Sequence, residues 1–490
     1  MQRASKVVVV VFDGLRPDMV TPDRMPNLAA FADDSLWFRE ARSVFPSMTR
    51  VATSSIATGA PPALHGIVGN SFYYPDVTRD FVLDTSRAED IALAESRLGS
   101  PLITTETLGD RLAAHDKSFA VVHSGSAGST YAINPRAAAN GHWIFSVMGR
   151  DATRTPHAVD EIVERFGPLP QRTLPRFEET DYVTRVFTEH VLCEMDPDVA
   201  LIWFNEPDTS FHYKFLASED TNAILRAVDA AFGRILAAIM RRPDADDIAI
   251  IAASDHGQIS SSGVADIATL LTGAGHKAAR GSSRAINGTD ITVTGGNMGE
   301  IRMVDGDMDR RDRIARWLMQ RDEIGMLFTP SADPVLGAVD GTFSTALVGL
   351  DHARQPELVY VLRSTTEADA YGLPGLGLIT GGVPVGGGMH GGLNRHELNT
   401  VFILGGIARG GSPGLSEAPS GIIDIAPTVL DLLGCKAPAS MRGISLMSAD
   451  AREQVVVPEV FETGSGVFRQ TLSVVCRGQH AFPIHGGRVN

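Results

Sequence analysis

The sequence predicts an α/β protein with a mostly parallel central sheet and helices on both of its faces. Two observations support this prediction. Continuous apolar runs rich in Val and Ile, typical of strands that are buried on both faces, recur along the chain. Segments whose apolar residues follow helical spacing lie between these runs. The expected strands are residues 6–12, 118–123, 199–204, 248–254 and 400–404.

The helical segments carry their own boundary signals. Residues 25–34 have Pro26 in the first turn, where its missing N–H costs nothing. Residues 221–241 form the longest amphipathic pattern, and residues 423–433 are followed by Gly434 as a stop. Further helices are expected at residues 104–115 and from residue 51 to 58.

One long region interrupts the alternation of strands and helices. Residues 263–385 are rich in glycine and scattered charges, yet they contain enough aromatic and aliphatic residues to fold. We therefore expect an inserted cap that packs over the site. The catalytic α/β core would then comprise residues 1–262 and 386–490.

Composition limits the function classes. The chain has 490 residues and a net charge of −15, which argues against a nucleic-acid scaffold or a binder of anionic membranes. The negative net charge does not exclude a small anionic substrate, because bound metal ions would make the charge at the site positive. The three scattered cysteines predict neither a disulfide framework nor a thiolate metal site. No signal peptide or membrane-spanning stretch is evident, so a cytoplasmic protein is expected; the oligomeric state is left open.

Acidic and imidazole side chains follow the ends of the expected strands. Ligand sites of parallel sheets lie at the carboxyl ends of the strands, so these side chains should meet there. Carboxylates and imidazoles in this number suit two metal ions with mixed O and N ligands, and two such ions activate a nucleophile and neutralise a phosphoryl oxyanion. The candidate ligands are Asp13, Asp208, His212, Asp255, His256 and, in a glycine-rich loop, His390.

A candidate nucleophile lies in the hydroxyl-rich segment before the helix expected at 51–58. Both Ser47 and Thr49 stand near the start of this helix, where unpaired backbone N–H groups favour an alkoxide and a bound phosphate. An unactivated hydroxyl is a weak nucleophile, and no histidine is adjacent in sequence. Metal activation is therefore the coherent choice, and the residues alone do not separate Ser47 from Thr49.

Several motifs, in this order along the chain, resemble those of the alkaline phosphatase superfamily. They are VFDG, the Thr49 region, TGAPPALHGIVGN, NEPDTSFH, SDHG and GMHGG. Within the superfamily the chain is similar to nucleotide pyrophosphatase/phosphodiesterases and to phosphonoacetate hydrolases. The resemblance implies an alkaline-phosphatase-like core and hydrolysis of a small phosphorylated substrate.

The resemblance also implies roles for individual residues. Thr49 would be the nucleophile that forms a covalent phosphoryl-enzyme intermediate, and Asn70 would bind the phosphate. The implied cofactors are two divalent metal ions, with zinc as the expected metal. One zinc would be held by Asp13, Thr49, Asp255 and His256, and the other by Asp208, His212 and His390.

Some positions depart from these families. Arg50-Val51-Ala52 follows Thr49 where the phosphodiesterases usually carry Phe-Pro-Asn, and residues 123–136 lack the lysines with which phosphonoacetate hydrolases bind the substrate carboxylate. No sulfatase motif is present. We therefore expect a phosphodiester or pyrophosphate hydrolase. The alternative is a phosphonate hydrolase or phosphomonoesterase of the same superfamily. A catalytically silent metal-binding protein is disfavoured, because structural zinc sites keep no open position.

Overall fold

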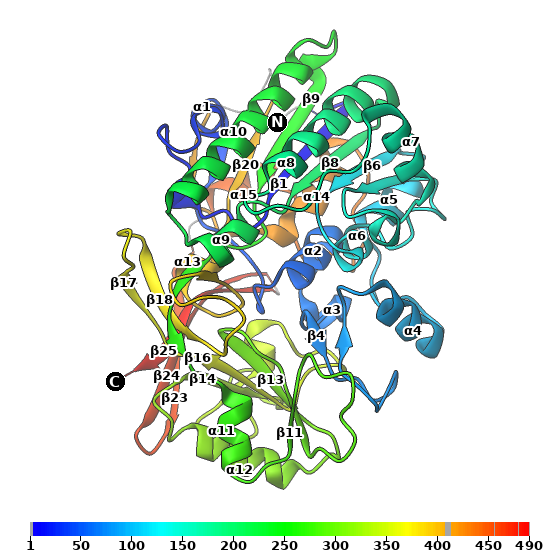
Figure 1. Cartoon of the computed structure of the whole chain (residues 1–490). Helices are drawn as coiled ribbons and strands as arrows, with labels where there is room; N and C mark the ends of the chain where they lie inside the picture. Colours follow the sequence, from blue (N-terminus) through cyan, green and yellow to red (C-terminus); the bar gives the residue numbers. More distant parts are fainter. Residues whose placement is uncertain (1–2, 407–412, 455, 479, 490) are drawn as a thin grey trace.

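The largest element of the fold is an eight-stranded sheet, with strand order β21-β2-β20-β9-β1-β8-β6-β7. It lies in the upper part of Figure 1, a computed structural model that describes residues 3–406, 413–454, 456–478 and 480–489. The central strand β1 (Lys6–Phe12) runs parallel to β8 (Val199–Phe204) on one side and to β9 (Ile248–Ala253) on the other. The expected strands at 6–12 and 199–204 are therefore confirmed.

The two halves of the sheet differ in strand direction. On the β8 side, β6 (Phe119–His123) and β7 (Trp143–Ser146) continue the parallel arrangement. On the β9 side, β20 (Phe402–Gly405) is antiparallel to both of its neighbours, β9 and β2 (Leu36–Phe38), and β21 (Gly414–Ser416) closes the edge parallel to β2. The sheet is mostly parallel, as predicted.

Helices cover both faces, as the side chains of β1 show. Val7, Val9 and Val11 pack with α2 (Thr49–Thr58), α5 (Leu108–Ala113) and α14 (Ile425–Leu432). On the opposite face, Val8, Val10 and Phe12 pack with α1 (Pro26–Asp33) and α10 (Glu219–Met240). Successive side chains of a strand point to opposite faces, so one apolar run serves two cores.

Helix boundaries shift where side chains cap them. The helix expected at 104–115 begins only at Leu108, because Thr107 and Asp110 form a reciprocal capping box. The helix expected at 423–433 starts as a 3₁₀ turn over Ile422–Asp424. The helix expected at 51–58 begins two residues earlier, so that Thr49 occupies its first position.

A second sheet fills residues 278–362 and lies in the lower part of Figure 1. Its strands pair mainly antiparallel in the order β11-β12-β13-β16-β14-β15, and helices α11 (Ile267–Gly273) and α12 (Met308–Leu318) pack against it. The strands are β11 (Ala278–Arg280), β12 (Ile291–Val293), β13 (Met298–Met303), β14 (Ile324–Thr329), β15 (Phe343–Ser344) and β16 (Leu358–Leu362).

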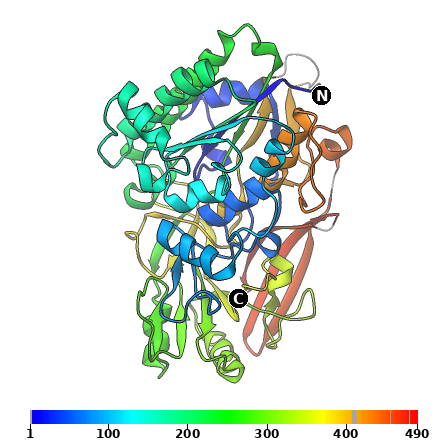
Figure 2. The ribbon, with the colours of Figure 1, turned by 90° about the vertical axis from the view of Figure 1, so that its right-hand side faces the viewer.

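The last strands of the chain lie beside this second sheet, as Figure 2 shows in red. β23 (Glu459–Ser465), β24 (Phe468–Arg477) and β25 (His480–Val489) form an antiparallel sheet. The Gln470 side chain joins them to β14 by two hydrogen bonds with the backbone of Leu327, at 2.9 and 3.1 Å.

A four-stranded sheet of order β17-β18-β10-β19 carries β19, whose second residue precedes His390. Its strands are β10 (Ile259–Val264), β17 (Ser364–Ala368), β18 (Pro374–Ile379) and β19 (Gly388–Met389). The remaining α-helices are α3 (Pro62–His65), α4 (Ala88–Leu98), α6 (Ala127–Ile133), α7 (His157–Phe166), α8 (Phe177–Arg185), α9 (Asp208–Lys214), α13 (Arg395–Leu398) and α15 (Ala449–Glu453). The remaining strands are β3 (Ala41–Arg42), β4 (Ser71–Phe72), β5 (Leu83–Asp84) and β22 (Ser420–Gly421).

Among the described residues, no helix combines the length and the apolar character needed to cross a bilayer. The three cysteines are unpaired, as their odd number and spacing predict.

Candidate metal centre and active site

Asp13 follows the last residue of β1 and enters a tight turn. Gly14 adopts φ +70°, a left-handed conformation that favours glycine, and a Cβ here would lie 2.8 Å from Nε2 of Gln258. The turn lets the Gly14 amide donate to Oδ1 of Asp255 at 3.1 Å. On the neighbouring strand, the Trp203 indole donates to Oδ2 of Asp13 at 3.0 Å. One oxygen of Asp13 is thus fixed by the fold, and the other faces the site.

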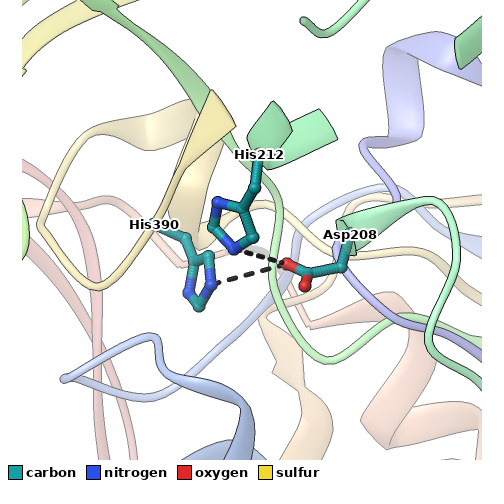
Figure 3. A group of neighbouring side chains, drawn as sticks. All are labelled: Asp208, His212 and His390. Atoms are coloured by element: carbon teal, nitrogen blue, oxygen red, sulfur yellow. Dashed lines mark ion pairs between the residues drawn. The ribbon is translucent and has the colours of Figure 1, made fainter. Parts of the chain in front are cut away.

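Asp208 is the first residue of α9, which begins just beyond β8, and His212 lies one turn later. Their i, i+4 spacing puts Oδ1 of Asp208 3.3 Å from Nε2 of His212. The same oxygen lies 3.5 Å from Nε2 of His390, so that two imidazoles converge on one carboxylate (Figure 3). Nε2 of Gln258 donates to this oxygen as well, at 2.5 Å.

His256 connects the remaining candidates. Its Nε2 lies 3.5 Å from Oδ1 of Asp13, 3.2 Å from Oδ2 of Asp255 and 3.3 Å from Oγ1 of Thr49. Its ring stacks on that of His390 with centroids 3.7 Å apart. The structure therefore brings all seven metal-ligand candidates from the sequence, Thr49 among them, into one contiguous cluster.

The three histidines share one orientation. Each Nδ1 faces a backbone carbonyl oxygen: His212 that of Gly388 at 2.7 Å, His256 that of Gly257 at 3.1 Å, and His390 that of Ser47 at 2.7 Å. A carbonyl can only accept, so Nδ1 carries the proton and Nε2 keeps its lone pair. This arrangement fixes the tautomer in which Nε2 can bind a metal ion. At Gly388 a Cβ would lie only 2.1 Å from Oε1 of Gln258, which accounts for the glycine.

Electrostatics in this buried cluster disfavour like charges. Burial and the nearby carboxylates of Asp255 and Asp208 raise the pKa of Asp13 well above its ordinary value. Burial also raises the pKa of Asp255, to which the charge of Asp208 adds. Burial lowers the pKa of His256 well below its ordinary value and that of His390 to about 4. Burial opposes protonation of His212 too, but the Asp208 carboxylate outweighs it and raises the pKa of His212. The neutral imidazoles of His256 and His390 offer lone pairs, and a bound cation would stabilise the carboxylates in their charged form.

The donor set suits divalent metal ions. Two groups of side chains each have ligand atoms within 4.8 Å of one another, Asp208 with His212 and His390, and Asp13 with Asp208 and His256. Oδ1 of Asp13 and Oδ2 of Asp255 are buried and receive no hydrogen bond from any described residue. Unpaired buried carboxylate oxygens are costly, and a cation is the partner that would offset this cost. Nitrogen and oxygen ligands without thiolate are compatible with zinc.

The two candidate nucleophiles have different surroundings. Thr49 is the first residue of α2, and its hydroxyl faces the metal-ligand cluster through His256. Ser47 is fully buried; its hydroxyl donates to the Gly392 carbonyl at 3.3 Å and accepts from the Gly391 amide at 3.0 Å. Ser47 thus holds the loop that follows His390. The neighbouring hydroxyls of Thr53 and Ser54 donate to carbonyls one turn earlier in the helix.

Asn70 lies beside the start of α2. Its Oδ1 accepts from the Arg50 amide at 3.2 Å, which satisfies one of the helix-terminal N–H groups that Met48 leaves without a side-chain cap. The Arg50 guanidinium donates to the Asn70 carbonyl at 3.2 Å and to Oγ1 of Thr85 at 2.8 Å. Arg50 is therefore engaged in holding the Asn70 segment.

Sequence reasoning missed Trp203 and Gln258, which orient the metal-ligand carboxylates. Trp203 sits in an uninterrupted apolar run, where a core residue is the default interpretation, and nothing in the spacing marks its indole N–H. His65, by contrast, bonds within its own loop and to α2. Its Nδ1 accepts from the Ile67 amide at 3.1 Å and its Nε2 lies 2.9 Å from Oγ of Ser55.

Comparison with solved structures shows a shared fold. Phosphonoacetate hydrolase from Sinorhizobium meliloti 1021, solved with phosphonoformate, superposes with a TM-score of 0.62 at 19% identity, over 88% of this chain and 96% of that one. Murine ectonucleotide pyrophosphatase/phosphodiesterase 5, solved in an inactive form with AMP, gives a TM-score of 0.59 at 16% identity, over 89% of this chain and 96% of that one.

Sequence relatives match over a shorter stretch. Bis(5'-adenosyl)-triphosphatase enpp4 of Xenopus laevis is 33% identical over 84 residues, 17% of this chain and 19% of that protein. An uncharacterized pyrophosphatase/phosphodiesterase, C725.05c of Schizosaccharomyces pombe, is 36% identical over 78 residues, 16% of each protein. The matches thus span less than a fifth of these curated relatives.

The family model described as type I phosphodiesterase/nucleotide pyrophosphatase matches residues 7–320, more than half of the chain. This range includes Asp13, Thr49, Asp208, His212, Asp255 and His256. The clustered carboxylates and imidazoles lie in the same fold, and the family match over more than half of the chain establishes that it belongs to the type I phosphodiesterase/nucleotide pyrophosphatase family.

Proposed function

We propose that this enzyme cleaves phosphodiester or pyrophosphate bonds, with Thr49 as nucleophile and two divalent metal ions, zinc being the expected metal. The observation that carries the proposal is the position of the Thr49 hydroxyl. It stands at the N-terminus of α2 and lies 3.3 Å from Nε2 of His256, beside buried carboxylates with unpaired oxygens.

Asp13, Asp255, His256 and Thr49 would hold one ion, and Asp208, His212 and His390 the other. A bound pair of such ions supplies positive charge that favours an ionised nucleophile and neutralises phosphoryl oxygens. The protein contributes the fixed orientation of each ligand. Trp203 and Gln258 hold the carboxylates, and backbone carbonyls hold the imidazoles.

Thr49 would act in two steps. Its oxygen attacks phosphorus, a bond from Oγ1 to phosphorus forms, and the bond from phosphorus to the leaving oxygen breaks. Water then attacks the phosphorylated threonine, which releases the phosphate product and returns the hydroxyl. The N-terminus of α2 favours the negative charge that develops in both steps. The Oδ1 atom of Asn70 already accepts a hydrogen bond from the Arg50 amide. The Nδ2 group of Asn70 is therefore the part that would donate a hydrogen bond to a phosphoryl oxygen.

Thr49→Ala tests this proposal. The variant should lose at least about 10³-fold in kcat on bis(4-nitrophenyl) phosphate, because no other group supplies the nucleophile. It should still bind metal, as measured by elemental analysis of protein purified without chelator. Wild-type protein should carry two ions per chain.

Ser47→Ala is the matched control, and it should leave most of the activity. If Ser47→Ala lost turnover while Thr49→Ala kept it, the nucleophile would be Ser47. Retained activity in Asp255→Ala with no metal bound would overturn the two-metal assignment.

A further inference from the structure

A cavity of about 480 Å³ opens between the start of α2 and the second sheet. Met48, which directly precedes Thr49, and Asn70 line one side of it. Residues from β12, β13 and the Gly295-Gly296 turn line the other. The volume lies in the range of sites for drug-sized ligands and exceeds what a phosphoryl group with a small substituent needs. A substrate bound at Thr49 can therefore extend into this cavity.

Arginines dominate the exposed charge of this cavity. Arg87, Arg280 and Arg284 line it with side chains that are 47%, 54% and 44% exposed. The acidic residues nearby are less accessible. Glu300 is buried, Asp266 is 28% exposed and pairs with Arg280, and Asp84 is 38% exposed. The three arginines are thus the most exposed charged side chains of the lining.

Arg87 and Arg284 share one buried carboxylate. Arg284 forms two hydrogen bonds to Asp90, at 2.6 and 2.8 Å, and Arg87 lies 3.9 Å from the same carboxylate, which is 3% exposed. The Arg284 guanidinium also lies over the Phe81 ring, 4.0 Å from its centroid. Arg284 is therefore held rigidly. Among the described side chains, the further ion-pair partner of the Arg87 guanidinium is Glu89, in a pair exposed on both sides.

The exposed pair of Arg87 with Glu89 contributes little to stability, so a ligand can displace Glu89 at low cost. Once Glu89 is displaced, two guanidiniums face one buried carboxylate and keep donors for another anion. Arginine is well suited to bind carboxylates and phosphates through two parallel hydrogen bonds.

We infer that this cavity is a subsite for an anionic group on one substituent of the substrate, with Arg284 and Arg87 as specificity-determining residues. The inference rests on the proposed diester hydrolysis. The recognised group is an oxyanion, a carboxylate or a phosphate, carried by an organic group large enough to enter the cavity. An uncharged substituent would form no ion pair with these guanidiniums, so its substrate would bind more weakly than one with an anionic substituent.

Matched synthetic diesters test the subsite. In the first, 4-nitrophenyl phenyl phosphate, the second substituent is neutral; in the second, 4-nitrophenyl 4-carboxyphenyl phosphate, it carries a carboxylate. Both release 4-nitrophenolate, so the assay is identical. Wild-type enzyme should cleave the carboxylated ester with a kcat/KM about tenfold higher, as expected for a hydrogen-bonded charge pair. A third ester with a 4-phosphonophenyl group distinguishes recognition of a phosphate-like dianion from that of a carboxylate.

Arg284→Ala should bring this preference close to unity, mainly by raising KM for the anionic esters, while the neutral ester is cleaved at an unchanged rate. Arg87→Ala should also reduce the preference for the anionic esters. A second variant with the same effect, and a Tm equal to that of wild type, would exclude a folding defect as the cause. Arg234→Ala is the control, because Arg234 pairs with Asp181 on exposed helices away from the cavity lining and should change nothing.

The outcomes separate the two proposals. Cleavage of all three esters with equal kcat/KM, or a preference that survives both variants, would overturn the subsite and leave the proposed function intact. Cleavage of no diester by the metal-loaded enzyme would overturn the proposed diester hydrolysis and the subsite with it.

Discussion

The side-chain oxygen of Asn70 accepts a hydrogen bond from the backbone amide of Arg50, the residue that follows Thr49, at 3.2 Å. This contact ties Asn70 to the first turn of α2. Because Oδ1 is committed to the helix, the Nδ2 group of Asn70 is the part left to meet a substrate. The backbone carbonyl of the same residue accepts from Arg50 and Thr85, so both ends of Asn70 are held.

Two substitutions separate the capping and substrate contributions of Asn70. Asn70→Ala should lower kcat/KM for a diester about 10²-fold or more, because a donor to the phosphoryl oxygens is lost. It should also destabilise the fold by about 1 kcal/mol through the lost cap of α2. Asn70→Asp keeps an acceptor for the Arg50 amide but offers no donor. Its activity should fall as far as that of Asn70→Ala while its unfolding free energy stays near wild type. Equal activity of Asn70→Ala and wild type would exclude a substrate contact.

The indole of Trp203 orients Asp13, and its removal should be detectable as weaker metal binding. Trp203→Phe keeps the ring packing but removes the donor to Oδ2 of Asp13. Loss of such an outer contact costs about 10–100-fold in metal affinity. Titration of metal-depleted protein against a chelating dye measures this directly. Trp143→Phe is the matched control, since Trp143 lies on the edge strand β7 and its indole donates to Glu161 of α7. An unchanged affinity in Trp203→Phe would show that Asp13 needs no such support.

The pH dependence of stability should reveal Glu397. This buried carboxyl accepts from the Gly392 amide at 2.7 Å and from the Asn297 side chain, and so joins the loop after His390 to the second sheet. Burial raises its pKa to about 7. The unfolded carboxyl ionises near pH 4.5. Between these values the folded state binds more protons, so this group's contribution to stability falls as pH rises from about 4.5 to 7.

Glu397→Gln keeps an oxygen for both donors but cannot ionise. The unfolding free energy of Glu397→Gln minus that of wild type should therefore increase between pH 5 and pH 8, by up to about 3 kcal/mol. Urea unfolding at pH 5, 6, 7 and 8 measures the difference, and groups common to both proteins cancel. A difference that does not change with pH would show that Glu397 ionises at its ordinary pKa in the folded protein.

The central strands of the large sheet and the candidate ligand residues could be predicted from the same feature of the sequence. Buried parallel strands are continuous apolar runs, and ligand residues follow where such runs end, as Asp13 follows β1 and Asp255 follows β9. Contacts made across the fold are not visible in this way. The indole of Trp203 and the amide of Gln258 reach their carboxylates only after distant segments meet. The second sheet was missed as a sheet for two reasons. Its edge strands β11 and β15 have three and two residues, too few to show a period, and its longer strands β13, β14 and β16 pair antiparallel without a regular alternation of strand and helix.

Substrate preference follows from the charges next to Thr49. A monoester carries an extra negative charge on the phosphoryl group, and this charge needs a free cation nearby. Arg50 is the residue placed to supply one, yet its guanidinium is bonded to the Asn70 carbonyl and to Thr85 and lies 3.7 Å from Asp84. The segment where phosphonoacetate hydrolases carry lysines has Arg136 instead, and Asp110 binds its guanidinium at 2.7 Å. A diester, with one charge on phosphorus and a substituent that can enter the cavity beside Met48 and Asn70, matches these surroundings better.

We therefore expect kcat/KM for bis(4-nitrophenyl) phosphate to exceed that for 4-nitrophenyl phosphate by about tenfold or more, since one unmatched charge costs at least about 1–3 kcal/mol. Phosphonoacetate should be the poorest of the three substrates, because its carboxylate is held too close to phosphorus to profit from a cavity of about 480 Å³. The three constants should be measured on one metal-loaded preparation at one pH. Freeing Arg50 offers a check within the same protein: Thr85→Val removes one of its acceptors and should narrow the gap between diester and monoester. A clear preference of wild type for the monoester or for phosphonoacetate would show that Arg50 serves the substrate and that the diester assignment is wrong.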